Sequence, residues 1–221
     1  MPKTENQESG FTSKNLLSHG CSMTFGCELE NPKQDAYPAL IAKSINYNNH
    51  NLAIPGTSND HIIKDILKYD KKIDLLLVGW TCETRFELGN YKGEVEKFGW
   101  NLVTPVSNKT LNKVLTTEYL NWDFYREVVY SQIILLQNYC EHNNIPYVFC
   151  WGTQNERTLS LHKKDNSYLK NQINWNRWFR PNDSFLTLTQ NDFEYSWDYH
   201  PLEEGHSYFA KLFADFVKEV L

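Results

Sequence analysis

The sequence predicts an α/β fold with a parallel, doubly wound sheet of about five strands. Short apolar runs alternate along the 221-residue chain with longer segments in which apolar residues recur at helical spacing. The clearest run, residues 73–79, is nearly continuous in Ile, Leu and Val, which is typical of a strand covered on both faces. Several runs end at or near a glycine, namely Gly20, Gly56 and Gly79. Each strand is therefore predicted to stop sharply before a loop and a helix.

Strand and helix signals alternate through the first eighty residues. Residues 15–18 predict a short buried strand, and residues 35–43 predict a helix because their apolar spacing is helical and their proline falls in the first turn. A second strand is predicted over 49–53. After it, Ser58 or Asn59 can cap a helix whose isoleucines share one face, and the strand at 73–79 follows.

The second half of the chain contains two irregular stretches. Residues 84–120 have glycines and aromatics but no sustained period, which predicts an insertion of loops and short elements at the edge where the strands end. The other predicted segments are a long helix over 122–143, a fourth strand over 145–151, an irregular insertion over 152–183, a short fifth strand over 184–188 and a last amphipathic helix over 206–221.

Composition and charge limit the classes of function. The chain is long enough to bury a core and is predicted to form one domain, 14–221, after a flexible polar arm over 1–13. A net charge of −5 without any run of Lys and Arg argues against a nucleic-acid partner. No stretch approaches the roughly 18 apolar residues of a membrane span, and the first residues lack a signal-peptide core, so we expect a cytoplasmic protein without a membrane partner. The five cysteines lack metal-ligand spacing, which predicts free thiols and no metal site.

Residues at opposite ends of the chain suggest nucleophilic catalysis. Ser22 follows the first predicted strand, whereas Asp198 and His200 directly precede the last helix. Because the loops after parallel strands gather at one edge of a sheet, these side chains can meet there. Ser22 would be the nucleophile, His200 the general base and Asp198 its orienting carboxylate, with the backbone N–H groups of Ser22 and Gly56 as oxyanion donors. The plainer alternatives are a helix N-cap at Ser22, a loop histidine at His200 and an ordinary turn at Gly56.

Four segments resemble the sequence blocks of the SGNH (GDSL-like) hydrolases, and together they span nearly the whole chain. Residues 20–24, Gly-Cys-Ser-Met-Thr, resemble the first block, G-D-S-x-T, and residues 51–59 are similar to the second block with its oxyanion-hole glycine. Residues 79–82 lie where the family has G-x-N-D, and 198–201 resemble the block that carries the catalytic Asp and His. The resemblance implies a flavodoxin-like three-layer α/β/α fold, a Ser nucleophile, no cofactor, and hydrolysis of an ester that is often an O-acetyl group.

The sequence departs from the family pattern at three positions. Cys21 replaces the usual Asp, and Thr81 replaces the side-chain amide that completes the oxyanion hole in the family. One residue separates Asp198 from His200, where the family has two. The resemblance therefore implies Thr81 as a third oxyanion donor, and if Thr81 does not serve, the alternatives are Asn59 or a side chain from the insertion over 84–120.

Three further residues are candidate contacts of the substrate: Asn59, Trp80 and Arg85. Arg85 could receive an anion of the substrate. The favoured alternative is a local ion pair between Arg85 and Glu83, two residues earlier in the chain.

The predicted function is a serine hydrolase that cleaves a small ester, such as an O-acetyl group on a carbohydrate, by a Ser-His-Asp acyl-enzyme mechanism without a cofactor. An acyltransferase on the same scaffold, or a binding module with weakened chemistry, are the alternatives. The sequence contains no signal for an oligomeric state.

Overall fold

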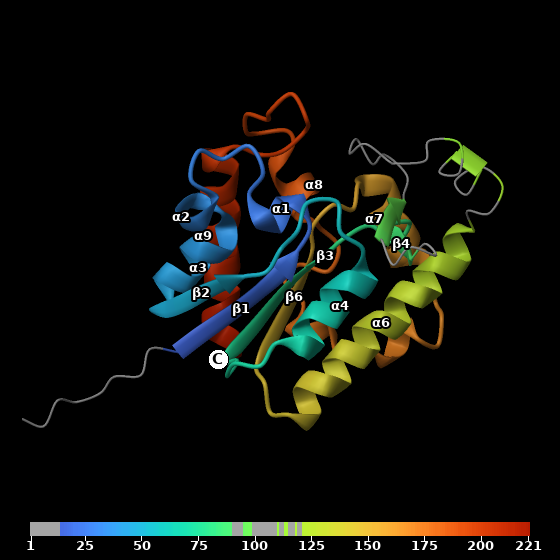
Figure 1. Cartoon of the computed structure of the whole chain (residues 1–221), viewed down its shortest axis with the longest axis horizontal. Helices are drawn as coiled ribbons and strands as arrows, with labels where there is room; N and C mark the ends of the chain where they lie inside the picture. Colours follow the sequence, from blue (N-terminus) through green and yellow to red (C-terminus); the bar gives the residue numbers. More distant parts are fainter. Residues whose placement is uncertain (1–13, 90–94, 99–109, 111–112, 115–117, 119–120) are drawn as a thin grey trace, which may run out of the picture.

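A four-stranded parallel sheet forms the centre of the molecule (Figure 1). The computed structural model describes residues 14–89, 95–98, 110, 113–114, 118 and 121–221, so the predicted arm over 1–13 lies outside the described residues. The strands are β1 (Lys14–Gly20), β2 (Tyr47–Asn51), β3 (Leu75–Trp80) and β6 (Tyr147–Trp151), in the order β2-β1-β3-β6. In the register of the sheet, Gly20 lies opposite Gly79, and Gly79 lies opposite Cys150. The carboxyl ends of β1, β3 and β6 therefore form one level edge.

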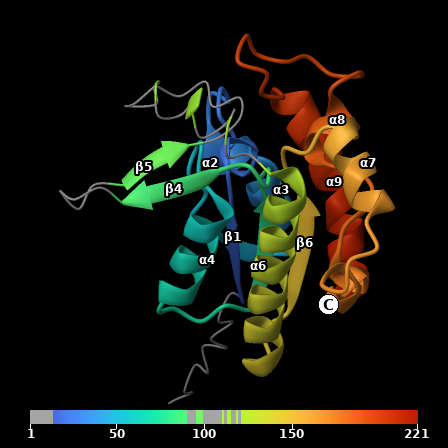
Figure 2. The ribbon, with the colours of Figure 1, turned by 90° about the vertical axis from the view of Figure 1, so that its right-hand side faces the viewer.

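Helices cover both faces of the sheet (Figure 2). Helices α4 (Asn59–Lys68) and α6 (Trp122–His142) pack on one face, while α3 (Tyr37–Ser44) and α9 (Glu203–Val220) pack on the other. Successive strand residues enter opposite cores: Leu76 and Val78 join the first, and Leu75 and Leu77 join the second. This accounts for the continuous apolar run at 73–79 and confirms the three-layer α/β/α prediction.

Side-chain caps explain where two of the main helices begin. Ser58 Oγ accepts a hydrogen bond from His61 N at the start of α4, so the first of the two predicted caps is the correct one. Asn121 Oδ1 accepts from Phe124 N in the same way at the start of α6. Helix α9 begins at Glu203, three residues before its predicted start, and buries His206, whose Nδ1 accepts from Tyr37 N at 3.1 Å.

The two predicted insertions contain regular elements. Within 84–120 an antiparallel hairpin is formed by β4 (Phe86–Gly89) and β5 (Val95–Phe98), and most of the remainder lies outside the described residues. Within 152–183 the chain forms helix α7 (Glu156–Lys164) and the short 3-10 helices η1 (Lys170–Gln172) and η2 (Trp175–Arg177). The prediction that this second stretch is irregular is therefore wrong for α7.

The predicted fifth strand over 184–188 is also wrong. Residues Phe185–Thr189 form helix α8, because Ser184 and Thr187 make a reciprocal capping box. The sheet edge beside β6 is instead extended by two isolated parallel bridges, Phe149 to Trp178 and Trp151 to Ser184. Among the described residues, no helix is both long and apolar enough to cross a bilayer. All five cysteines are free thiols, as predicted.

Candidate active site

Ser22 is the first residue of the short helix α1 (Ser22–Phe25), which starts directly after β1. Gly20 allows this close turn, because a Cβ at residue 20 would lie 2.1 Å from Thr24 Oγ1 and 2.8 Å from the Gly79 carbonyl oxygen. The Thr24 hydroxyl is in turn hydrogen-bonded to Tyr37 Oη at 2.9 Å. Ser22 is 7% exposed, and within the described part of the chain its hydroxyl has no hydrogen-bond partner. The serine therefore stands at the carboxyl edge of the sheet with its hydroxyl uncommitted.

The loop that carries Gly56 lies beside this turn. Ile54 N donates to the Gly20 carbonyl at 3.1 Å, which attaches the loop to the end of β1. Gly56 is buried and has φ of 70°, a left-handed conformation that glycine adopts without strain. Glu87, from β4, accepts from Ser58 N at 3.4 Å and from Thr57 Oγ1 at 3.5 Å. The hairpin thus supports the loop that presents the Gly56 N–H.

Thr81 follows β3 and is held by four neighbours. Its N–H donates to Asn59 Oδ1 at 3.0 Å, and its carbonyl oxygen accepts from Asn59 Nδ2 at 3.1 Å and from Gln154 Nε2 at 2.9 Å. Its hydroxyl oxygen accepts from Arg85 Nη1 at 2.9 Å and lies 3.4 Å from Thr153 Oγ1. Because a guanidinium can only donate, the Thr81 hydroxyl keeps its own proton for another acceptor.

His200 and Asp198 lie in a tight turn ahead of α9. Ser196 N donates to the His200 carbonyl at 2.9 Å, and Tyr199, between the two side chains, has a left-handed φ of 58°. This turn brings Asp198 Oδ2 to 4.0 Å from His200 Nδ1, which is beyond hydrogen-bonding distance. His200 Nδ1 is screened from water and has no partner among the described residues. The shortened D-x-H spacing therefore brings the two groups together without bonding them.

Glu28 is a second carboxylate beside His200. One ligand atom from each of Glu28, Asp198 and His200 lies within 4.8 Å of the others, so the three side chains could also hold a metal ion. Glu28 follows α1 and has a left-handed φ of 69°. Since Glu28 is six residues after Ser22, its contact with Asp198 and His200 brings the last loop of the domain to the segment that follows the serine.

Burial lowers the pKa of His200 below its ordinary value of 6.5. The negative charges of Asp198 and Glu28 act in the opposite direction, and the Arg85 guanidinium lowers the pKa further. No hydrogen bond joins Ser22 Oγ to His200 in the part of the chain that the structure describes. The lowered pKa favours the neutral imidazole, which is the form that a proton acceptor needs.

The three predicted substrate contacts have different environments. Asn59 is buried, and its amide is engaged by the backbone of Thr81. Trp80 is fully buried in the core beside α4 and α6, with its ring edge-on to Phe149, so it is not where a substrate could touch it. Arg85 remains at the site. It makes no ion pair with Glu83, whose Oε1 lies 3.7 Å from His162 Nε2, and the favoured prediction of a Glu83–Arg85 pair is wrong.

Sequence analysis missed three residues that support the site: Glu28, Glu87 and Gln154. Glu28 and Gln154 lie in loops without a recognisable spacing. Glu87 had a weak signal, because it lies two residues after Arg85, which directly precedes β4.

Solved structures of other proteins share this architecture. A member of the lipolytic protein G-D-S-L family from Veillonella parvula aligns with a TM-score of 0.52 at 14% identity, over 95% of this chain and 98% of that one. A carbohydrate esterase family 2 enzyme with a carbohydrate binding domain, from Corynascus thermopiles (Myceliophthora fergusii), aligns with a TM-score of 0.54 at 11% identity. This alignment covers 100% of the present chain and 68% of the esterase.

An acetyl xylan esterase from the rumen bacterium Butyrivibrio proteoclasticus aligns with a TM-score of 0.53 at 16% identity, over 94% of this chain and 64% of the esterase. No protein-family model and no curated protein sequence matches the chain. These alignments extend over nearly all of the chain. The chain thus has the three-layer fold of the SGNH (GDSL-like) hydrolases, in a divergent form.

Proposed function

We propose that this protein hydrolyses carboxylic esters through a covalent intermediate on Ser22. The observation that carries the proposal is the arrangement at the sheet edge: an uncommitted serine hydroxyl, the Gly56 loop attached to the same turn, and a proton-bearing Thr81 hydroxyl in a rigid frame. A neutral imidazole lies in the loop that contacts the segment following α1. Ester cleavage needs these groups: a nucleophile, a base and donors for the oxyanion.

The reaction begins when Ser22 Oγ attacks the acyl carbon and its proton passes to His200. The oxyanion is stabilised by the N–H groups of Ser22 and Gly56 and by the Thr81 hydroxyl. When the intermediate collapses, the alcohol leaves with the proton from His200. Water then attacks the acyl-enzyme, its proton passes to His200, and the acid is released as Ser22 regains its proton. Asp198 stabilises the imidazolium that forms in each half of the cycle.

A short acyl group on a carbohydrate is the substrate class that we favour. The support is indirect: two of the proteins that share the fold are named as carbohydrate esterases, one of them an acetyl xylan esterase. An acetyl group is also small enough for a serine that is only 7% exposed.

Covalent labelling tests the proposal directly. An alkyl phosphonate is expected to form an adduct that mass spectrometry maps to Ser22, and Ser22→Ala should abolish both the adduct and the release of acetate from aryl acetates. Ser18→Ala is a suitable control, because Ser18 is a buried serine of β1 whose hydroxyl donates to Asn49. An adduct on Cys21, or hydrolysis that persists in Ser22→Ala, would refute the role of Ser22.

A binding module with the same fold is the second candidate. It is favoured by one observation, the 4.0 Å separation between His200 Nδ1 and Asp198 Oδ2, which leaves the imidazole without a hydrogen-bonded carboxylate. Catalytic hydrogen bonds often shorten only when substrate binds, so we rank this candidate second. A protein that binds acetylated sugars but neither reacts with phosphonates nor releases acetate would be a binding module.

A further inference from the structure

Arg85 is a cation at the candidate active site, and no carboxylate among the described residues forms an ion pair with it. It is half-buried, and its single hydrogen bond within the described residues runs from Nη1 to the Thr81 hydroxyl. Its Nε is screened from water and has no acceptor in the same part of the chain. A guanidinium carries five N–H donors, so most of the hydrogen-bonding capacity of this side chain is unused.

The acids that flank Arg85 in the sequence are both engaged elsewhere. Glu83 is buried on the side of His162, with Oε1 at 3.7 Å from Nε2 of that ring. Glu87 faces His61, with Oε2 at 2.9 Å from Nδ1, and it also accepts hydrogen bonds from the loop after Gly56. Neither carboxylate lies within 4.0 Å of the Arg85 guanidinium. The two acids nearest to Arg85 in the sequence therefore do not compensate its charge.

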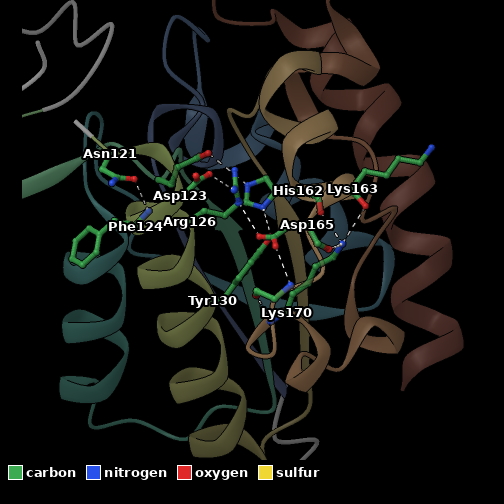
Figure 3. A network of polar contacts seen from close by, with 11 residues as sticks. Asn121, Asp123, Phe124, Arg126, Tyr130, His162, Lys163, Asp165 and Lys170 are labelled. Atoms are coloured by element: carbon green, nitrogen blue, oxygen red, sulfur yellow. Dashed lines mark hydrogen bonds and ion pairs between the residues drawn. The ribbon is translucent and has the colours of Figure 1, made fainter. Parts of the chain in front are cut away.

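Arg126 shows how the same fold treats another desolvated arginine (Figure 3). Its side chain is 10% exposed and is bound by two carboxylates, Asp123 and Asp165, the latter at 2.8 Å from Nε. Removing a cation from water is costly unless an anion replaces the lost hydration. Arg126 has that compensation, whereas none of the carboxylates that the structure describes provides it for Arg85.

Arg85 also lies close to the groups proposed to react. It contacts Thr81, the proposed oxyanion donor, and its charge acts on the imidazole of His200. The negative charges near His200, Glu28 and Asp198, belong to the loops after α1 and before α9, and neither lies within 4.0 Å of the Arg85 guanidinium. The other described neighbours of Thr81 are Asn59, Thr153 and Gln154, all uncharged. An anion bound at Arg85 would therefore meet no opposing carboxylate among these neighbours of Thr81.

We propose that Arg85 binds an anionic group of the substrate, so that the preferred esters carry a carboxylate or phosphate next to the scissile acyl group. This inference rests on the proposed ester hydrolysis and assigns its substrate class: acylated hydroxy acids, acidic sugars or sugar phosphates. A planar guanidinium suits both anions, because it can donate two parallel hydrogen bonds to either. Arg85 is in this view a specificity-determining residue, and the substrate supplies the anion that the described residues do not.

Matched pairs of esters test the proposal. O-acetylglycolate is compared with its uncharged amide, O-acetylglycolamide, and 2-acetoxyethyl phosphate with 2-methoxyethyl acetate, by measuring acetate release. We expect kcat/KM to favour the charged member of at least one pair, and the pair that shows the preference identifies carboxylate or phosphate as the anion. In Arg85→Gln the preference should fall by roughly 10- to 100-fold, mainly through a higher KM, as is typical when a charge-assisted hydrogen bond is lost.

Two further variants make the test specific. Arg85→Lys retains the charge but not the paired donors, so it should keep part of the preference, and it provides a second reading if Arg85→Gln folds poorly. Arg157→Gln removes an exposed arginine of α7 and should leave the preference unchanged. Equal activity of the wild-type protein on both members of both pairs would overturn the proposal. So would a fall in kcat that is the same for charged and uncharged esters in Arg85→Gln, because Arg85 would then act only through Thr81.

Binding to Ser22→Ala separates this inference from the proposed hydrolysis. Saturation-transfer NMR is expected to detect O-acetylglycolate or 2-acetoxyethyl phosphate on Ser22→Ala, and to lose that signal in the double variant with Arg85→Gln. Such binding without any hydrolysis by the wild-type protein would support the anion site and refute the esterase. Hydrolysis by the wild-type protein without charge-dependent binding would support the esterase and refute the anion site at Arg85.

Discussion

The side-chain amide of Asn59 is hydrogen-bonded to both backbone groups of Thr81, accepting from its N–H at 3.0 Å and donating to its carbonyl oxygen at 3.1 Å. The family that this sequence resembles has an amide side chain at the position of Thr81 itself. Here the amide comes from the first residue of α4 and fixes the backbone that carries a hydroxyl. The oxyanion hole that we propose therefore uses two residues: Asn59 clamps the backbone of Thr81, and Thr81 supplies the hydroxyl donor.

Asn59→Ala is expected to lower both stability and activity. It leaves the buried Thr81 N–H without an acceptor, whereas the Thr81 carbonyl keeps its bond from Gln154. One such unsatisfied group costs about 1–3 kcal/mol, which urea denaturation can measure. Asn166→Ala, at an exposed position after α7, should change neither quantity. Unaltered kcat in Asn59→Ala would mean that the clamp does not position a catalytic donor.

Thr81→Val tests the hydroxyl with little change of shape. If this hydroxyl stabilises the oxyanion, its loss should reduce kcat by up to roughly 10²–10³-fold with a smaller effect on KM. Thr81→Ser keeps an acceptor for Arg85 Nη1 and a proton to donate, so it should retain most of the activity. Equal kcat values for the Val and Ser variants would exclude the hydroxyl as a donor.

The activity should persist to lower pH than an ordinary histidine base would allow. Burial and Arg85 lower the pKa of His200, so the imidazole stays neutral below pH 6.5 and kcat/KM should fall only at a lower apparent pKa. Glu28→Gln removes a charge that raises this pKa and should move the profile further toward acid. Arg85→Gln removes a charge that lowers it and should move the profile toward neutral pH. If both variants shift the profile in the same direction, His200 is not the group that titrates.

Gly79→Ala should destabilise the protein strongly. The new Cβ would lie 2.5 Å from Thr24 Oγ1 and 2.7 Å from Tyr37 Oη, in the contact that docks α1 on the sheet. Overpacking of this kind costs typically about 1–3 kcal/mol, measurable as a lower thermal midpoint. Gly152→Ala is the matched control, because its Cβ would meet the Trp80 carbonyl oxygen only at 3.3 Å. Similar losses in the two variants would show that the Thr24 contact is not the cause.

The sequence predicted the sheet well because its signals are local. Residues 75–78 are apolar throughout, and burial on both faces of the sheet is the reason. The failure at 184–188 has an equally local cause: Phe-Leu-Thr-Leu suits a strand, but the Ser184–Thr187 capping box favours a helix. Helix α7 could have been predicted from Asn155 as its cap and from Leu159 and His162 three residues apart on one buried face.

The site was less accessible to sequence reasoning, because its contacts join loops that are far apart in the chain. Ser22, Gly56 and Thr81 could be named from motifs, and whether they react together with His200 stays a prediction. Nothing in the sequence pairs Glu28 with His200, 172 residues later, or turns Glu83 away from Arg85. These relationships depend on the tertiary structure, in particular on where the left-handed residues Glu28 and Tyr199 turn the backbone.

The order of the elements along the chain has a consequence for biosynthesis. All four strands of the central sheet lie before residue 152, whereas Asp198 and His200 lie just ahead of α9. As the chain leaves the ribosome, the serine and the glycine and threonine loops emerge first, and the proposed base follows together with the helix that covers one face of the sheet. With His200 as the base that we propose, the Ser22 hydroxyl of a nascent polypeptide stays unactivated until the chain has been translated as far as residue 200. The proposed reactivity would then arise together with α9, which contributes Phe209, Phe213 and Val217 to the hydrophobic core.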